Sequence, residues 1–87
     1  METKMMEHLK SLYQKYGYYQ FWHINAPKDK SFSKLLLETQ GAINEVFAIL
    51  VECGFSELAR TLNREKLINK GKKMAQKDFD CQYCDIA

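Results

Sequence analysis

The chain has 87 residues, of which 46% are hydrophobic and 28% charged, and its net charge is +2. This length fits one domain, and the composition excludes an intrinsically disordered chain. The longest apolar run, 46–51, is far shorter than the ~20 residues of a membrane span, and residues 1–7 lack the apolar core of a signal peptide, so we expect a cytoplasmic protein.

The first predicted helix covers residues 2–16. Its apolar residues recur at steps of three and four and share one face: Met5, Leu9, Leu12 or Tyr13, and Tyr16. Gly17 is a natural helix end. Residues 18–27 favour an extended conformation by propensity, but the chain offers no second strand-like run to pair with them. We expect either an extended segment packed on the helices or a short continuation of the first helix.

The second predicted helix, 33–53, is the most apolar segment. Hydrophobic residues cover all of its circumference except a narrow polar strip, which is typical of a helix surrounded by other elements. Asp29, Ser31 and Ser33 are candidate N-caps. Gly41 costs about 1 kcal/mol relative to alanine inside a helix, so it either permits close contact with another helix or splits this one. We expect this helix at the centre of the fold.

Two further helices are predicted at 56–62 and 64–77. Their apolar residues would lie on nearly opposite sides of one continuous helix, and Asn63 is a good N-cap, so a break near Asn63 is expected. Residues 78–87 form a short tail. The sequence thus predicts one all-α domain over 1–77, a compact bundle of three to four helices around the central helix 33–53.

An aromatic segment is the first candidate binding site. Aromatic side chains combine a large contact area with few rotamers and are enriched at binding hot spots. The segment consists of Tyr16, Tyr18, Tyr19, Phe21 and Trp22. It is predicted to bind a protein partner; the alternatives are that these rings complete a small core, or that they stack on nucleic acid or a small ligand.

A basic face is the second candidate. On a helix over 64–77 one face carries Lys66, Lys70, Lys73 and Lys77, and Arg64 adds charge nearby. Such a face can neutralise phosphates or meet an acidic partner. It is also typical of a helix surface in contact with water.

The third candidate is the pair Cys81 and Cys84, whose Cys-x-x-Cys spacing can place two thiolates on one zinc ion. Zinc needs two more ligands, either from Cys53 with a histidine or from a second chain. The acids that flank the pair disfavour a reactive thiolate, which argues against a redox role. The alternative is that the pair has no function, so no cofactor is expected unless zinc binds here.

These features predict a small non-enzymatic protein-binding module, because none of the familiar catalytic motifs occurs in the sequence. Its size suggests a regulator or inhibitor of the phage or mobile-element type, docking on a larger macromolecule. The alternative is a nucleic-acid-binding protein that uses the helix 64–77, with zinc at Cys81 and Cys84. A third reading is a homodimer joined through the aromatic surface or a shared metal.

Overall fold

The computed structural model describes residues 2–84, with side chains over 4–81. The elements are α1 (Glu2–Asn25), α2 (Ser31–Glu52), α3 (Ser56–Thr61) and α4 (Arg64–Cys84). Within the described residues there is no strand, so the predicted all-α bundle of three to four helices is confirmed. None of the described helices is long and apolar enough to cross a membrane.

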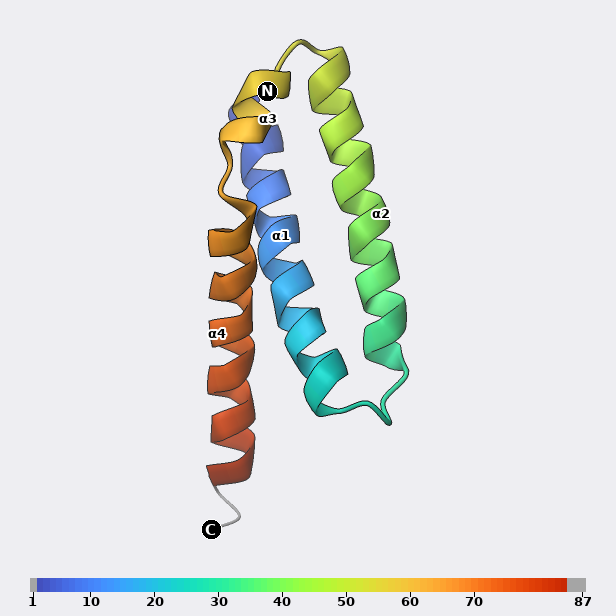
Figure 1. Ribbon diagram of the computed structural model, residues 1–87, viewed down its shortest axis with the longest axis vertical. Helices are drawn as coiled ribbons and strands as arrows, with labels where there is room; N and C mark the ends of the chain where they lie inside the picture. Colours follow the sequence, from blue (N-terminus) through green and yellow to red (C-terminus); the bar gives the residue numbers. More distant parts are fainter. Residues whose placement is uncertain (1, 85–87) are drawn as a thin grey trace.

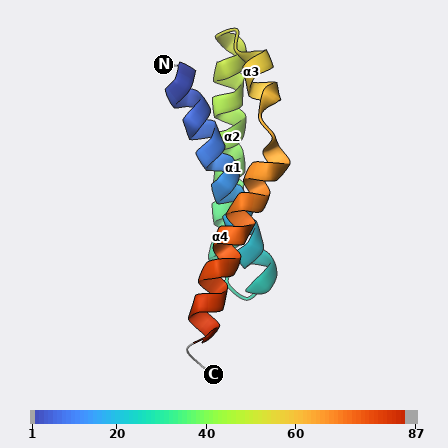
Figure 2. The ribbon, with the colours of Figure 1, turned by 90° about the vertical axis from the view of Figure 1, so that its left-hand side faces the viewer.

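The helix at the centre of the fold is α1, and the central position predicted for the helix 33–53 is wrong. In Figure 1, α4 and α2 lie on either side of α1, and the short α3 lies at the top beside the end of α2. Figure 2 shows α4 crossing α1 along its length. The molecule is a rod of 52 × 21 × 18 Å. A rod this thin has room for only one helix between two others. α1 takes this central place because other helices can contact it closely on both sides.

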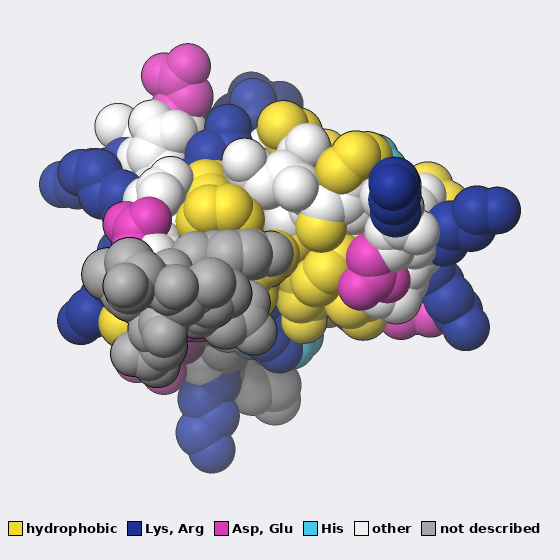
Figure 3. Space-filling view, turned by 90° about the horizontal axis from the view of Figure 1, so that it is seen from below, with side chains coloured by type: hydrophobic (Ala, Val, Ile, Leu, Met, Phe, Trp, Pro, Cys, Tyr) yellow, Lys and Arg dark blue, Asp and Glu magenta, His cyan; other side chains and the backbone are white. Residues whose placement is uncertain are grey.

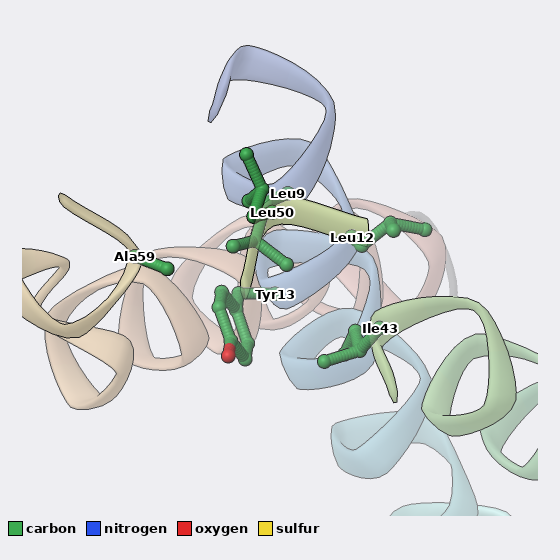
Figure 4. Close-up of a cluster of buried hydrophobic side chains, with 6 residues drawn as sticks. All are labelled: Leu9, Leu12, Tyr13, Ile43, Leu50 and Ala59. Atoms are coloured by element: carbon green, nitrogen blue, oxygen red, sulfur yellow. The ribbon is translucent and has the colours of Figure 1, made fainter. Parts of the chain in front are cut away.

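The hydrophobic core lies in the upper half of the rod, where α1, α2 and α3 meet (Figure 4). Leu9 of α1 and Leu50 of α2 are fully buried. The other buried members of this cluster are Leu12, Tyr13, Ile43 and Ala59. Full burial of a leucine side chain contributes about 1.5–3 kcal/mol, so these few residues are the main apolar anchor of α2.

Two glycines bring α1 and α4 into direct backbone contact. A Cβ atom placed on Gly17 would lie 2.8 Å from the carbonyl carbon of Ile68, and one placed on Gly71 would lie 2.8 Å from that of Gln14. Only residues without a side chain fit at such a crossing. The prediction that Gly17 ends the first helix is therefore wrong: α1 continues through it to Asn25, and residues 18–25 are a helical continuation.

The helix ends follow local chemistry. α2 starts two residues earlier than predicted, and its N-cap is Lys30, which makes no side-chain cap bond, so none of the candidate caps occupies that position. The Asp29 carboxylate, one residue before the N-cap, accepts a hydrogen bond from the Ser31 amide at 3.0 Å. Gly54 closes α2 with a φ of 86°, a conformation that favours glycine. The Asn63 side chain accepts a bond from the Lys66 amide at 3.1 Å, and the predicted break at Asn63 is confirmed.

Two expectations about length and continuity need correction. α4 does not end at residue 77 but continues to Cys84, so most of the predicted tail is helical; residues 85–87 lie outside the described part. Gly41 neither splits α2 nor permits a contact, since no neighbouring atom lies within 4 Å of a Cβ placed there.

Candidate functional site

The aromatic segment joins three helices at the lower end of the rod. Trp22 of α1 stacks on Phe32 of α2, with ring centroids 5.8 Å apart and planes at 12°. Trp22 and Phe21 also contact Phe79 of α4, at 5.7 and 5.8 Å. Offset and edge-to-face pairs at these distances stabilise by about 0.5–1.5 kcal/mol each beyond their burial. Phe21 and Trp22 therefore contact rings of α2 and α4, but both stay only partly buried and outside the core cluster, and a role of the segment in binding a protein stays a prediction.

The lower end nevertheless keeps apolar surface. Figure 3 views it from below and shows several groups of exposed hydrophobic side chains, with lysine and arginine side chains projecting around them. Ile24, at this end of α1, is 65% exposed.

Tyr18 links α1 to α4 through a hydrogen bond. Its hydroxyl donates to the Asp78 carboxylate at 2.7 Å, and its ring packs edge-on against Tyr19, with centroids 5.9 Å apart. Loss of the phenolic proton would remove this bond and leave two negative charges side by side. The hydrogen bond to Asp78, followed by partial burial, therefore raises the pKa of Tyr18 above its ordinary value of 10.0.

This raised pKa predicts a loss of stability in alkaline solution. Because the folded-state pKa exceeds the unfolded value, the contribution of Tyr18 is complete below pH 10 and is lost as the pH rises through the folded-state pKa. An ultraviolet titration of tyrosine ionisation, compared with that of Tyr18→Phe, should show the Tyr18 phenol ionising above its ordinary value. Asp78→Asn should move that pKa back toward 10.0; an unchanged titration in Asp78→Asn would rule out the hydrogen bond as the cause.

A pocket of about 420 Å³ lies where α1, α2 and the start of α4 meet. Tyr13 and Tyr16 of α1 and Phe47 of α2 line it. Arg64 of α4 and polar side chains of α2 also line it. The structure thus places Tyr16 and Arg64 together, although the sequence assigned them to separate sites. The pairing was not foreseeable, because it depends on α4 folding back beside α1.

The four lysines of the basic face form a row on α4. Lys66, Lys70, Lys73 and Lys77 are all exposed. At about 100° per residue they fall within an arc of about 60°, and at 1.5 Å per residue they span about 16 Å. The opposite side of α4, with Gly71 and Ala75, is buried. A shallow groove of about 450 Å³ runs along the row and is lined by Asn63, Glu65, Lys66, Asn69, Lys70 and Lys73.

The cysteines lie at the end of α4. Cys81 is an exposed free thiol, and the side chain of Cys84 lies outside the described residues. Cys53 is in the connection after α2, at the opposite end of the rod (Figure 1), so it cannot join Cys81 in one site. No three of the described histidine, cysteine and acidic side chains come together as a metal site. Zinc shared between the cysteine pairs of two chains stays a prediction.

One surface was missed in the sequence. α2 leaves Leu37 73% exposed, Val51 45% and Ile49 41%. The sequence does contain a sign of this surface, since α2 is apolar on nearly every side, but that pattern was interpreted as a helix buried by other elements.

Comparison of the chain with protein-family models, curated proteins and solved structures gives no match. The surfaces described above are therefore interpreted from their own geometry.

Proposed function

We propose that the protein is a small non-enzymatic binding module that docks through the lysine row of α4 on an acidic surface of a larger protein partner. The row is the observation that supports this proposal. Four exposed ammonium groups share one face, and the buried face of α4 is held against α1 by the Gly71 contact. Because the lysines lie on a helix that is already packed, the backbone that carries them loses little conformational freedom on binding, which favours affinity.

The spacing of the row suits a protein surface. Successive lysines are three or four residues apart, so their side chains lie about one helical turn, or 5.4 Å, from one another. Acidic residues spaced by one turn on a partner helix would repeat at the same interval. Complementary charge of this kind raises the association rate and fixes register. A module that covers such a surface would act as a regulator or inhibitor of its partner.

The groove beside the row favours protein over nucleic acid. Glu65 and two asparagines line it together with the lysines. A carboxylate here would repel a phosphate backbone, whereas a protein surface of mixed charge can pair with both kinds of group. The modest net charge of +2 also gives little general attraction to polyanions.

The test measures binding of the full chain to a polyglutamate peptide by fluorescence anisotropy. A variant with Lys66, Lys70, Lys73 and Lys77 changed to Gln should bind at least ~4-fold more weakly, because four exposed ion pairs at about 0.2–1 kcal/mol each add up to about 0.8–4 kcal/mol. The matched control changes four exposed lysines elsewhere to Gln: Lys4, Lys10, Lys15 and Lys28. Equal weakening in both variants would mean that net charge alone drives binding and that the row is no site.

Nucleic-acid binding through α4 is the second candidate, because the Asn63-capped start of α4 presents the lysine row directly after the short α3. Salt distinguishes the two candidates. Binding to a short DNA duplex should weaken with a slope of about −0.9 per phosphate neutralised in a plot of log affinity against log salt. Tighter binding to the duplex than to polyglutamate, with a slope near the value of about −3.6 expected for four lysines, would favour nucleic acid over the protein partner.

A further inference from the structure

The pocket of about 420 Å³ between α1, α2 and the start of α4 has the composition of a small-molecule site. Such sites hold about 300–1,000 Å³ and combine apolar walls with a few polar groups. Here the apolar wall consists of three aromatic rings and two isoleucines. The polar groups come from four exposed side chains: Gln40, Asn44, Arg64 and Glu65.

A tyrosine hydroxyl without a partner faces this pocket. Tyr13 is only 6% exposed, and none of the described residues forms a hydrogen bond with its hydroxyl. No buried polar side-chain atom of the described residues lacks a partner, so the hydroxyl belongs to the small exposed part of Tyr13 and is reached through the pocket. Figure 4 shows the oxygen at the end of the ring that points away from the leucines of the core. Because hydroxyls inside proteins are nearly always hydrogen-bonded, a molecule in the pocket is expected to bond to this one.

Two amides supply hydrogen-bonding groups on the α2 side of the pocket. Gln40 and Asn44 are one helical turn apart, and the Gln40 side-chain nitrogen donates to the Asn44 side-chain oxygen at 3.1 Å. Each amide carries two donors and one oxygen, so the linked pair still offers both donors and an acceptor. A ring with polar atoms along its edge can therefore pair with them.

Positive charge dominates the α4 side of the pocket. None of the described carboxylates pairs with the guanidinium of Arg64. A smaller hollow of about 220 Å³ adjoins the pocket, since Phe47 and Arg64 line both, and it adds the guanidinium of Arg60. Arg64 also begins α4, whose dipole favours an anion at this end. Glu65 is the one acid among the described residues that line the pocket, and the two arginines outweigh its charge.

We propose that the pocket binds a small flat molecule that consists of an aromatic ring and one acidic group, either a carboxylate or a phosphate. The ring packs against the aromatic wall, where stacked and edge-on contacts stabilise it. The acidic group lies at Arg64, because a guanidinium holds a carboxylate or a phosphate through two parallel hydrogen bonds. A polar atom of the ring bonds to the Tyr13 hydroxyl, and the two amides pair with its remaining polar atoms.

The size and position of the pocket separate this proposal from the proposed function. A volume of about 420 Å³ lies near the lower end of the range for small-molecule sites, which suits a compound of one or two rings. None of the four lysines of the row lines the pocket. Loss of ligand binding would therefore leave docking through the row unaffected, and the reverse also holds.

Isothermal titration calorimetry of the full chain tests the proposal with two probes, indole-3-acetate for a carboxylate and adenosine 5′-monophosphate for a phosphate. At least one probe should bind with a Kd of about 1 mM or lower, and the probe that binds identifies the acidic group. Indole, adenosine, acetate and inorganic phosphate each lack the acid or the ring and should bind at least ~10-fold more weakly. Absence of binding by both probes would overturn the proposal, as would equally tight binding of an acid without a ring.

Two variants locate the bound probe. Tyr13→Phe keeps the ring and should weaken binding about 2–10-fold through the loss of one hydrogen bond, and Arg64→Gln should weaken it at least ~10-fold because bonds to charged groups are stronger. The matched controls Tyr19→Phe and Lys28→Gln make comparable changes outside the pocket and should leave binding unchanged. The proposal fails if Tyr13→Phe binds as tightly as Tyr19→Phe, or Arg64→Gln as tightly as Lys28→Gln.

Nuclear magnetic resonance of the wild type locates the probe without any substitution. The side-chain amide signals of Gln40 and Asn44 should shift when the probe is added. Those of Asn25 and Gln76, which lie outside the pocket and bond within their own helices, should stay in place. Shifts at Asn25 and Gln76 with none at Gln40 and Asn44 would place the probe elsewhere and overturn the proposal.

Discussion

Replacing Gly71 with alanine is expected to lower the free energy of unfolding by about 2–3 kcal/mol, the cost of an overpacked contact. The added methyl would lie 2.8 Å from the carbonyl carbon of Gln14, and backbone atoms cannot turn aside as a flexible side chain can. α4 would have to move away from α1 along its length. Since a protein of 87 residues has a total stability of about 4–13 kcal/mol, this one methyl group removes a large part of it. Chemical denaturation at one low protein concentration measures the loss.

Gly41→Ala is the matched control, because it makes the same chemical change inside a helix without a contact. It should raise the stability of the single chain by up to about 1 kcal/mol through helix propensity alone. The two alanine variants thus differ in sign. If Gly71→Ala were as stable as Gly41→Ala, the close approach of α1 and α4 would be wrong.

Replacing Trp22 with alanine is expected to cost about 2–3 kcal/mol, less than the 3–5 kcal/mol of a fully buried tryptophan because this side chain is only partly buried. The substitution removes the stack on Phe32 and the contact with Phe79 together, and so loosens α2 and α4 at the lower end. Denaturation gives the total cost, and hydrogen exchange should show reduced protection in the last turns of α4.

Ile24→Ala is the control for Trp22, since this neighbouring residue is 65% exposed and should change stability by no more than about 0.5 kcal/mol. The outcome also separates the two readings of the aromatic segment. A Trp22→Ala variant as stable as Ile24→Ala, but unable to bind a partner, would assign the segment to binding rather than to packing.

The elements that local chemistry determines could be predicted from the sequence. Asn63 caps a helix through its own side chain and Gly54 closes one through its φ, so the break and the end of α2 were both predictable. The lysine row was also predictable, because its spacing is a property of one helix. These features depend on neighbours within a few residues.

The errors concern residues whose role depends on a distant part of the chain. Glycine is common at helix ends, so Gly17 by itself predicts such an end. Only the packing of the Ile68 backbone against it makes Gly17 the point where two helices cross. The apolar character of α2 indicated burial on every side, but the fold covers only part of this helix and leaves Leu37, Ile49 and Val51 exposed. The pocket lined by both Tyr16 and Arg64 could not be predicted for the same reason, since these residues are far apart in the sequence.

The close backbone approaches at Gly17 and Gly71 also join helices that lie far apart in the sequence. The two glycines are 54 positions apart (71 − 17), and α4 is the last of the four helices to be made. A contact between residues so far apart must first close a long loop of chain, which costs entropy before the contact can stabilise the fold. The packing of α4 on α1 therefore makes folding of this helical chain slower than that of a bundle held only by contacts between successive helices.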